Sequence, residues 1–123
     1  MSTTARSCLG HRGEALAAEH LERLGFSVVA RNHRTRWGEI DIIASDEKRM
    51  LVFAEVKTRR AGSGHPFDAL GPTKQRQVRR MASSWLAETA GRPWTSSLRF
   101  DAIGVVIDAR GELVCLEHLE GAF

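Results

Sequence analysis

Cysteine is scarce in this chain of 123 residues, and its spacing argues against two classes of site. The two cysteines, Cys8 and Cys115, lie far apart and form no CxxC pair. A zinc site or a disulfide framework is therefore not expected. Two free thiols in a reducing compartment are the simpler interpretation.

Long apolar runs are also missing. Charged residues interrupt the apolar ones throughout the first 25 positions, so the N-terminus lacks a signal-peptide core. No run approaches the length that spans a membrane, and there is no internal repeat or low-complexity segment. These absences predict a cytoplasmic protein with no membrane partner.

The length and composition describe one ordinary domain over residues 1–123. Hydrophobic residues make up 42% of the chain and charged residues 27%, which is close to the globular average. A chain of this size can bury a core without disulfides or metals to hold it. The net charge of +3 is compatible with a nucleic-acid partner but does not require one.

The first half of the chain predicts one helix and three strands. Residues 1–8 are expected to be loose. Leu16, Leu21 and Leu24 fall at helical spacing and predict a helix over 10–24, which Gly25 ends. A strand follows over 26–31, and 32–37 form a polar turn or an extension of that strand. Two apolar runs over 38–44 and 50–57 then predict a β-hairpin.

The second half predicts one helix and two strands. A loop rich in glycine and proline covers 61–73. Thr73 is expected to cap a helix that runs to about Thr89 and is ended by Gly91 and Pro93. Strands are expected over 98–107 and 113–119. The resulting order αβββαββ predicts an α/β fold with a mixed central sheet flanked by helices.

Acidic residues inside the predicted hairpin are the most informative feature of the sequence. If the turn is 45–49, Ala44 pairs with Met50, Asp41 with Phe53, and Glu39 with Glu55. Glu39, Asp41, Glu55 and Lys57 then share one face, whereas Ile40, Ile42, Val52, Ala54 and Val56 form an uncharged opposite face.

Carboxylates placed side by side on a strand repel one another, and a divalent cation would offset that repulsion. Hard oxygen donors favour Mg²⁺ or Mn²⁺. Lys57 beside Glu55 could hold a phosphate oxygen or orient a water molecule. Metal, lysine and carboxylates together suit phosphodiester hydrolysis. A salt-bridged surface face is the alternative interpretation of this cluster. Glu14, in the predicted first helix, is a further candidate member of the site, and a solvated helix glutamate is the alternative interpretation of Glu14.

Basic residues border the acidic hairpin in three groups. They precede the second strand, follow the third strand, and crowd the start of the second helix. Contact with a phosphate backbone is their natural use, although any single arginine is more often simply solvated. Trp37 could stack on a base, but a packed tryptophan is the commoner case. The candidate nucleic-acid-binding residues are Arg34, Arg36, Arg59, Arg60, Lys74, Arg76, Arg79 and Arg80.

These residues resemble the restriction-endonuclease-like PD-(D/E)XK nuclease superfamily. Asp41 matches its first metal-binding aspartate, and Glu55-Val56-Lys57 matches its ExK element. Glu14 looks like the helix glutamate of its Holliday-junction-resolvase-like members. Ile40 replaces the proline of the namesake pattern, which is a common departure.

A closer resemblance is to the small YraN-like bacterial family, and it runs nearly end to end. It covers Gly13-Glu14 with Ala17 and Leu21, Gly25, Arg31-Asn32, Gly38 to Ile43, Phe53 to Arg59, Lys74, Arg99-Phe100-Asp101 and Ala122-Phe123. This resemblance implies a nuclease-like fold with an intact site, without a settled substrate.

The sequence therefore predicts a Mg²⁺- or Mn²⁺-dependent nuclease acting on DNA, with branched or repair intermediates as candidate substrates. Asp41 and Glu55 would bind the metal with help from Glu14, Lys57 would contact the scissile phosphate or the attacking water, and Glu39 would be auxiliary. A non-catalytic nucleic-acid-binding module and a partner-dependent subunit are the alternatives. The sequence leaves open DNA or RNA, and monomer or homodimer.

Overall fold

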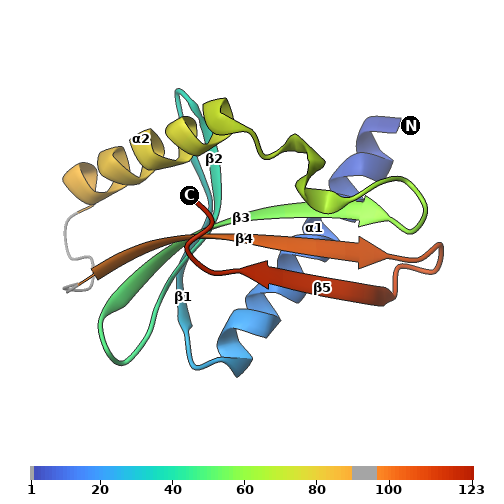
Figure 1. The fold of residues 1–123 in the computed structure, drawn as a ribbon, viewed down its shortest axis with the longest axis horizontal. Coiled ribbons are helices and arrows are strands. Elements are labelled where there is room, and N and C mark those ends of the chain that lie inside the picture. The colour runs from blue at the N-terminus through green and yellow to red at the C-terminus, as the bar shows by residue number, and fades with distance from the viewer. Residues whose placement is uncertain (1, 90–96) are drawn as a thin grey trace.

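A five-stranded sheet with the order β1-β2-β3-β4-β5 carries one helix on each face in the computed structural model, which describes residues 2–89 and 97–123 (Figure 1). The predicted α/β fold and its order of elements are confirmed. The elements are α1 (Ser2–Arg23), β1 (Ser27–Thr35), β2 (Gly38–Ser45), β3 (Met50–Arg60), the short 3₁₀ helix η1 (Pro66–Ala69), α2 (Pro72–Glu88), β4 (Ser97–Ile107) and β5 (Leu113–Leu119).

The sheet is mixed because one of its connections crosses over. β1 with β2, β2 with β3, and β4 with β5 are antiparallel, whereas β3 and β4 are parallel. Parallel neighbours need a long connection, and the segment that contains η1 and α2 supplies it. Among the described residues, none of the helices is long and apolar enough to cross a membrane.

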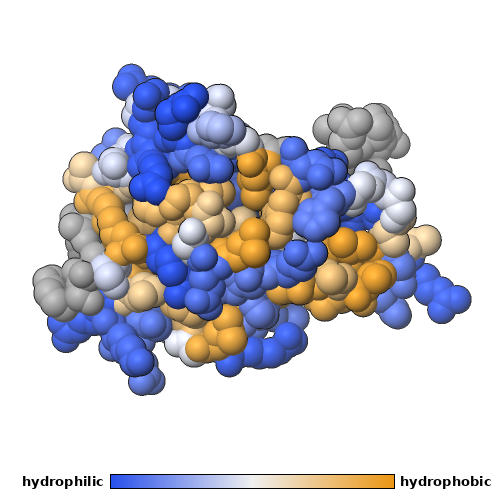
Figure 2. All heavy atoms as spheres, in the orientation of Figure 1, coloured by the Kyte–Doolittle hydropathy of each residue, from blue (hydrophilic) through white to orange (hydrophobic). Residues whose placement is uncertain are grey.

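Alternating residues of β3 divide the core into two clusters. Val52, Ala54 and Val56 pack against α1, whereas Leu51 and Phe53 pack against α2. Figure 2 shows hydrophilic residues along the outer side of α2 and apolar residues on the part of the sheet beside it. The exposed large apolar residues include Leu98, Leu113, Val114 and Leu119 of β4 and β5.

The first helix is longer than predicted and ends differently. It begins at Ser2, eight residues before the predicted start at Gly10. Leu24 is 52% exposed and does not belong to the buried stripe, because the helix stops at Arg23. Gly25 ends it as expected, with a positive φ of 97°. Phe26 packs against the core in place of Leu24.

The hairpin is confirmed, but its register differs from the prediction. Ala44 pairs with Val52 rather than Met50, and Ile43 rather than Asp41 lies opposite Phe53. The cause is a shorter turn, in which the Asp46 N–H already donates to the Met50 carbonyl oxygen at 3.2 Å. The shift is an even number of residues along β3, so its residues keep their predicted faces.

The predicted uncharged face is also interrupted in β2. Ile42 packs on the α1 side, but Ile40 belongs to the cluster beneath α2. The regular alternation fails near Asn32, which lies between the pairs Arg31–Ile42 and His33–Ile40 and has a positive φ of 52°. Asparagine tolerates this left-handed conformation. Beside it in β2, Ile40 and Ile42 pack on different sides of the sheet. β1 continues to Thr35, so 32–35 are a strand extension.

The crossover segment contains more structure than the predicted loop. η1 packs on the sheet, because Gly104 of β4 leaves space that a side chain would have to share with Phe67 and Pro66. α2 begins at Pro72 with Gly71 as its N-cap, so Thr73 is not the cap. Proline fits the first helical position, where its missing N–H is not needed. Gly91 and Pro93, the expected stop, lie outside the described residues.

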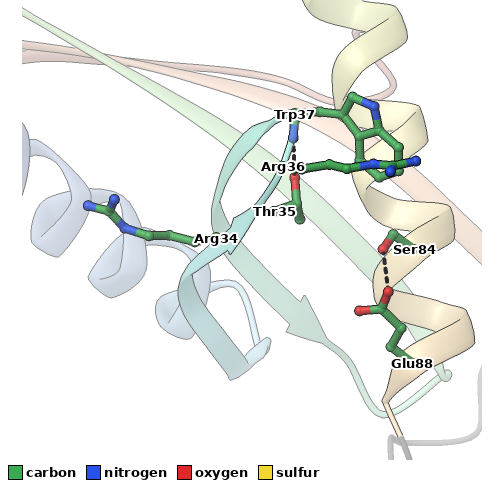
Figure 3. Close-up of a pocket in the computed structure, with 6 residues that line it drawn as sticks. All are labelled: Arg34, Thr35, Arg36, Trp37, Ser84 and Glu88. Carbon is green, nitrogen blue, oxygen red and sulfur yellow. Dashed lines mark hydrogen bonds between the residues drawn. The ribbon is translucent and has the colours of Figure 1, made fainter.

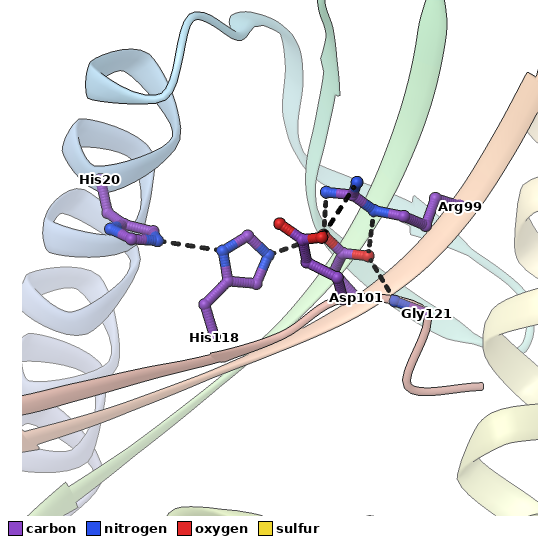
Figure 4. Close-up of polar contacts among 6 residues, drawn as sticks. His20, Arg99, Asp101, His118 and Gly121 are labelled. Atoms are coloured by element: carbon purple, nitrogen blue, oxygen red, sulfur yellow. Dashed lines mark hydrogen bonds and ion pairs between the residues drawn. The ribbon is translucent and has the colours of Figure 1, made fainter.

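A buried ionic network joins α1, β4 and β5 (Figure 4). Asp101 is fully buried and accepts two hydrogen bonds from Arg99 at 2.8 Å. His118 Nε2 lies 2.7 Å from Asp101 Oδ2, and His20 Nε2 lies 3.0 Å from His118 Nδ1. The Gly121 N–H also donates to Asp101. Burial alone would raise the pKa of Asp101, but the hydrogen bonds from His118 and Arg99 outweigh it and lower that pKa.

Substitution of Asp101 by asparagine is expected to destabilise the fold by roughly 3–5 kcal/mol at pH 7, because it leaves Arg99 without its buried partner. Because the pKa of Asp101 is lower in the folded chain than in the unfolded chain, its ionised form contributes fully to the free energy of unfolding above the unfolded pKa of about 4. This contribution is lost as the pH falls through the folded pKa. Urea unfolding at pH 7 and at pH 3 measures both effects. Glu120→Gln, which removes only the exposed 3.6 Å pair of Arg99, should cost under about 1 kcal/mol. Equal losses in the two variants would contradict this account.

Candidate functional site

The site forms where β2 and β3 separate. The main-chain pairing between them runs from Ser45 with Leu51 to Ile42 with Ala54. Beyond it the Asp41 side chain takes over, and its Oδ2 accepts a hydrogen bond from the Val56 N–H at 2.8 Å. Asp41 is therefore held in place by the backbone of the neighbouring strand and is only 9% exposed.

Three carboxylates meet at this point. One oxygen each of Glu14 from α1 and of Glu39 and Asp41 from β2 lie within 4.8 Å of one another. We call this set the carboxylate triad. Glu14 and Glu39 are half-buried, and Asp41 is buried. The sequence predicts that Asp41 and Glu14 belong to one site and that Glu39 is auxiliary. The structure brings all three carboxylates together.

Asn32 is a site residue to which the sequence analysis gave no role. With its amide nitrogen facing the triad, it donates to Glu14 Oε2 at 2.7 Å and to Glu39 Oε1 at 2.9 Å. Its left-handed backbone lies opposite Asp41 in the ladder. The Arg31-Asn32 motif was the only sequence feature that pointed to Asn32 as a site residue, because a lone asparagine beside a strand otherwise indicates a turn.

Gly13 explains how α1 comes close enough to deliver Glu14. A side chain at this position would overlap the Thr58 side chain of β3. The absence of a Cβ lets the helix lie directly on the strand. The next residue, Glu14, then reaches the triad.

Burial and mutual repulsion dominate the electrostatics of Asp41 and Glu14. Burial, followed by the negative charge of Glu55, raises the pKa of Asp41 to about 8, although the Val56 N–H opposes this. Burial and then Glu39 raise the pKa of Glu14, and the hydrogen bond from Asn32 opposes that shift. A cation at this point would favour the ionised form of each group.

Glu55 is also buried, but it faces two ammonium groups. Its Oε1 lies 3.4 Å from Lys57 Nζ and 3.2 Å from Lys74 Nζ. Lys57 is on the same strand, whereas Lys74 comes from the first turns of α2. The predicted charged face is thus divided: Glu39 and Asp41 turn toward Glu14, and Glu55 turns toward the lysines. Glu55 remains close enough to act electrostatically on Asp41.

A cavity of about 520 Å³ opens beside Glu14, between α1 and the second half of β3. Two of the predicted nucleic-acid-binding residues, Arg59 and Arg60, lie on its wall. Arg60 also donates to the Asp108 carbonyl oxygen at 3.5 Å. The lining is completed by Leu9, Gly10, Val56, Thr58 and Ser63. A ligand that entered here would meet the guanidinium groups of Arg59 and Arg60 and the carboxylate of Glu14.

The remaining predicted cations spread over two neighbouring regions. Arg34 is exposed and lies 3.6 Å from Glu39. Arg79 lies over the Phe100 ring and Arg80 over the Trp37 ring, so they leave α2 toward different neighbours. Arg36 also covers Trp37. Arg76 is exposed and contacts Thr73 within the helix.

Comparison with known proteins identifies the family. Residues 13–105 match the model of the uncharacterised protein family UPF0102. The chain belongs to this family. UPF0102 is the YraN family that the motifs resemble, and the matched residues include the whole triad, Glu55 and both lysines.

Similarity to individual UPF0102 proteins extends over nearly the whole chain. A UPF0102 protein of Streptomyces griseus subsp. griseus is 48% identical over 118 residues, covering 95% of this chain and 97% of that protein. One from Rhodococcus jostii is 46% identical over 116 residues, covering 94% and 95%. One from Syntrophotalea carbinolica is 48% identical over 122 residues, covering 98% and 95%. Their names give the family and no activity.

The raised pKa of Asp41 predicts an unusual dependence of stability on pH. Between an unfolded pKa of about 4 and the folded value of about 8, the folded chain binds a proton that the unfolded chain releases. The free energy of unfolding of the metal-free protein should therefore fall as the pH rises through this window. Asp41→Asn removes the titration and should be more stable than the wild type by roughly 1–3 kcal/mol at pH 8, with little difference near pH 4.

Chemical denaturation in a chelator from pH 4 to pH 8 measures this effect. Glu47→Gln, a substitution at an exposed position of the hairpin turn, serves as the control and should follow the wild type. Addition of Mn²⁺ at pH 8 should raise the melting temperature of the wild type and of Glu47→Gln but not of Asp41→Asn. A wild-type stability that rises steadily with pH would show that the pKa of Asp41 is not raised in the folded chain.

Proposed function

We propose that this protein is a metal-dependent nuclease that hydrolyses phosphodiester bonds in DNA, with branched or repair intermediates as its substrates. The observation that carries the proposal is the meeting of Glu14, Glu39 and Asp41 within 4.8 Å, where burial and the negative charge of Glu55 raise the pKa of Asp41. Lysine and arginine side chains border this point on both sides.

The donor set of the triad fits Mg²⁺ or Mn²⁺. It offers only carboxylate oxygens, which hard divalent cations prefer, and no sulfur or imidazole. Glu14, Glu39 and Asp41 would hold the ion, and Glu55 is a further candidate ligand from β3. When bound, such an ion neutralises phosphate charge and makes a coordinated water more acidic.

The chain's own residues supply the rest of the chemistry. The ammonium group of Lys57 is part-exposed and is held by the buried Glu55 at 3.4 Å. From there it can donate to a phosphate oxygen and stabilise the charge that develops on it in the transition state. Lys74 shares the same carboxylate oxygen, so one lysine can move to the substrate while the other keeps Glu55 neutralised. Arg59 and Arg60 would hold the adjoining phosphates in the cavity beside Glu14.

Cleavage assays with a panel of labelled linear, flapped and four-way DNA test the proposal. Cleavage should require Mg²⁺ or Mn²⁺, and Asp41→Asn and Lys57→Ala should each reduce it by roughly 100-fold or more. Lys48→Ala in the exposed hairpin turn is the matched control for Lys57 and should cleave like the wild type.

Equal cleavage by the wild type and Asp41→Asn would show that the activity belongs to a contaminant. Binding without cleavage of any substrate would favour a non-catalytic DNA-binding module. That alternative has one specific observation in its favour, since Glu55 is directed at two lysines rather than at the triad.

Salt dependence of binding tests the cavity separately from the chemistry. If Arg59 and Arg60 contact phosphates, the double change to alanine should reduce the slope of log affinity against log salt by about two. The Asp41→Asn background prevents cleavage during the measurement. Arg23→Ala, at the other end of α1 in an exposed pair with Glu19, should leave the slope unchanged. An unchanged slope in the Arg59/Arg60 variant would place the phosphate contacts elsewhere.

A further inference from the structure

A second cavity, of about 470 Å³, lies between the β1–β2 turn and the second half of α2 (Figure 3). This volume is in the range of sites for small organic groups. We call it the turn groove. It is lined by Arg34, Thr35, Arg36, Trp37, Ser84 and Glu88. The proposed nuclease chemistry makes no use of it.

A stacked arginine and tryptophan form one wall of the turn groove. The Arg36 guanidinium lies 4.5 Å from the centre of the Trp37 ring, and Figure 3 shows both side chains directed toward α2. Arg80 of α2 approaches the same ring at 5.7 Å. Trp37 is half-buried against the core beneath α2, so its position is fixed. Arg36 is exposed and can present the outer face of its planar guanidinium to a ligand.

The charges of the turn groove favour an anionic ligand with a flat ring. Two of its lining residues, Arg34 and Arg36, are cationic, and a guanidinium stacks on planar rings as well as binding phosphate. The one carboxylate of the groove, Glu88, accepts a hydrogen bond from Ser84 at 3.1 Å. Aromatic and guanidinium planes beside positive charge are the combination that binds single-stranded nucleic acid.

The position of the turn groove ties it to the carboxylate triad. Trp37 lies in the turn that precedes β2, two residues before Glu39, so the two Cα atoms are at most roughly 7 Å apart. Arg34, at the mouth of the groove, pairs with Glu39 itself at 3.6 Å. A nucleic acid whose phosphate lay at the triad would therefore have a neighbouring nucleotide within reach of Trp37.

We propose that the turn groove binds an unpaired nucleotide of the substrate, with its base stacked on the Arg36–Trp37 pair. The inference rests on the proposed function and defines its substrate class: nucleic acid in which a single strand joins a duplex. Bases inside a duplex are stacked on each other and cannot reach a side-chain plane, whereas an unpaired base can.

The test uses two DNA hairpins with the same duplex, one blunt and one with a thymidine tail that carries a 2-aminopurine. Binding is measured with the full chain carrying Asp41→Asn, so that neither DNA is cut. The tailed hairpin should bind more tightly, and its 2-aminopurine fluorescence should fall as the base stacks. Adding Trp37→Leu should weaken binding of the tailed hairpin roughly 5- to 100-fold, restore the fluorescence, and leave binding of the blunt hairpin unchanged.

Two milder variants keep the test informative if Trp37→Leu disturbs the fold. Trp37→Phe retains an aromatic plane and should retain most of the preference for the tail. Arg36→Lys retains the charge but not the plane, and it should reduce that preference. Retention of the blunt-hairpin affinity in each variant shows that the rest of the surface is intact.

The outcomes separate this inference from the proposed function. A wild-type groove with no preference for the tail, or variants that weaken both hairpins equally, would overturn the inference even if the protein cleaves DNA. A tail preference that depends on Trp37 would support it even if no cleavage is found. Failure of the folded protein to bind either hairpin would overturn both.

Discussion

The hydrogen bond from the Val56 N–H to Asp41 is the interaction on which the site depends. It replaces a main-chain bond at the point where β2 and β3 part. A strand pair that continued regularly would leave its carboxylates on a flat surface, open to water. Here the fork draws one carboxylate into the sheet and leaves room for Glu14 to approach from α1. Burial of Asp41 and the convergence of the triad follow from this local exchange of partners, and the burial in turn raises the pKa of Asp41.

The two sides of the fork are electrostatically different, and this difference makes the arrangement suited to a phosphate ester. One side gathers three carboxylates, with the exposed Arg34 3.6 Å from Glu39. The other side surrounds the single carboxylate of Glu55 with Lys57 and Lys74. A phosphodiester needs a cation for its oxygens and a means of activating water, and these two environments lie next to each other.

Sequence patterns were sufficient where the determining contacts are local. The span of β5, 113–119, was predicted without error, because alternation and flanking turns fix a short strand. The hairpin and the nearness of Asp41 to Glu55 also followed from adjacent segments. The register failed by two residues because the turn length depends on whether Asp46 bonds across it. The role of Asn32 and the network from His20 to Asp101 depend on packing between distant segments, which periodicity does not reveal.

Gly13 gives the site a mechanical property that its chemistry does not suggest. The spacing between α1 and β3 is set by direct contact between a helix backbone and the Thr58 side chain. A side chain at position 13 would overlap Thr58, and α1 would have to tilt away from the sheet as a rigid helix. Glu14 would then move off while Asp41, Glu39 and the two lysines kept their places. The alignment of the carboxylates is thus set by the absence of a side chain at the residue before Glu14, which itself takes no part in the chemistry.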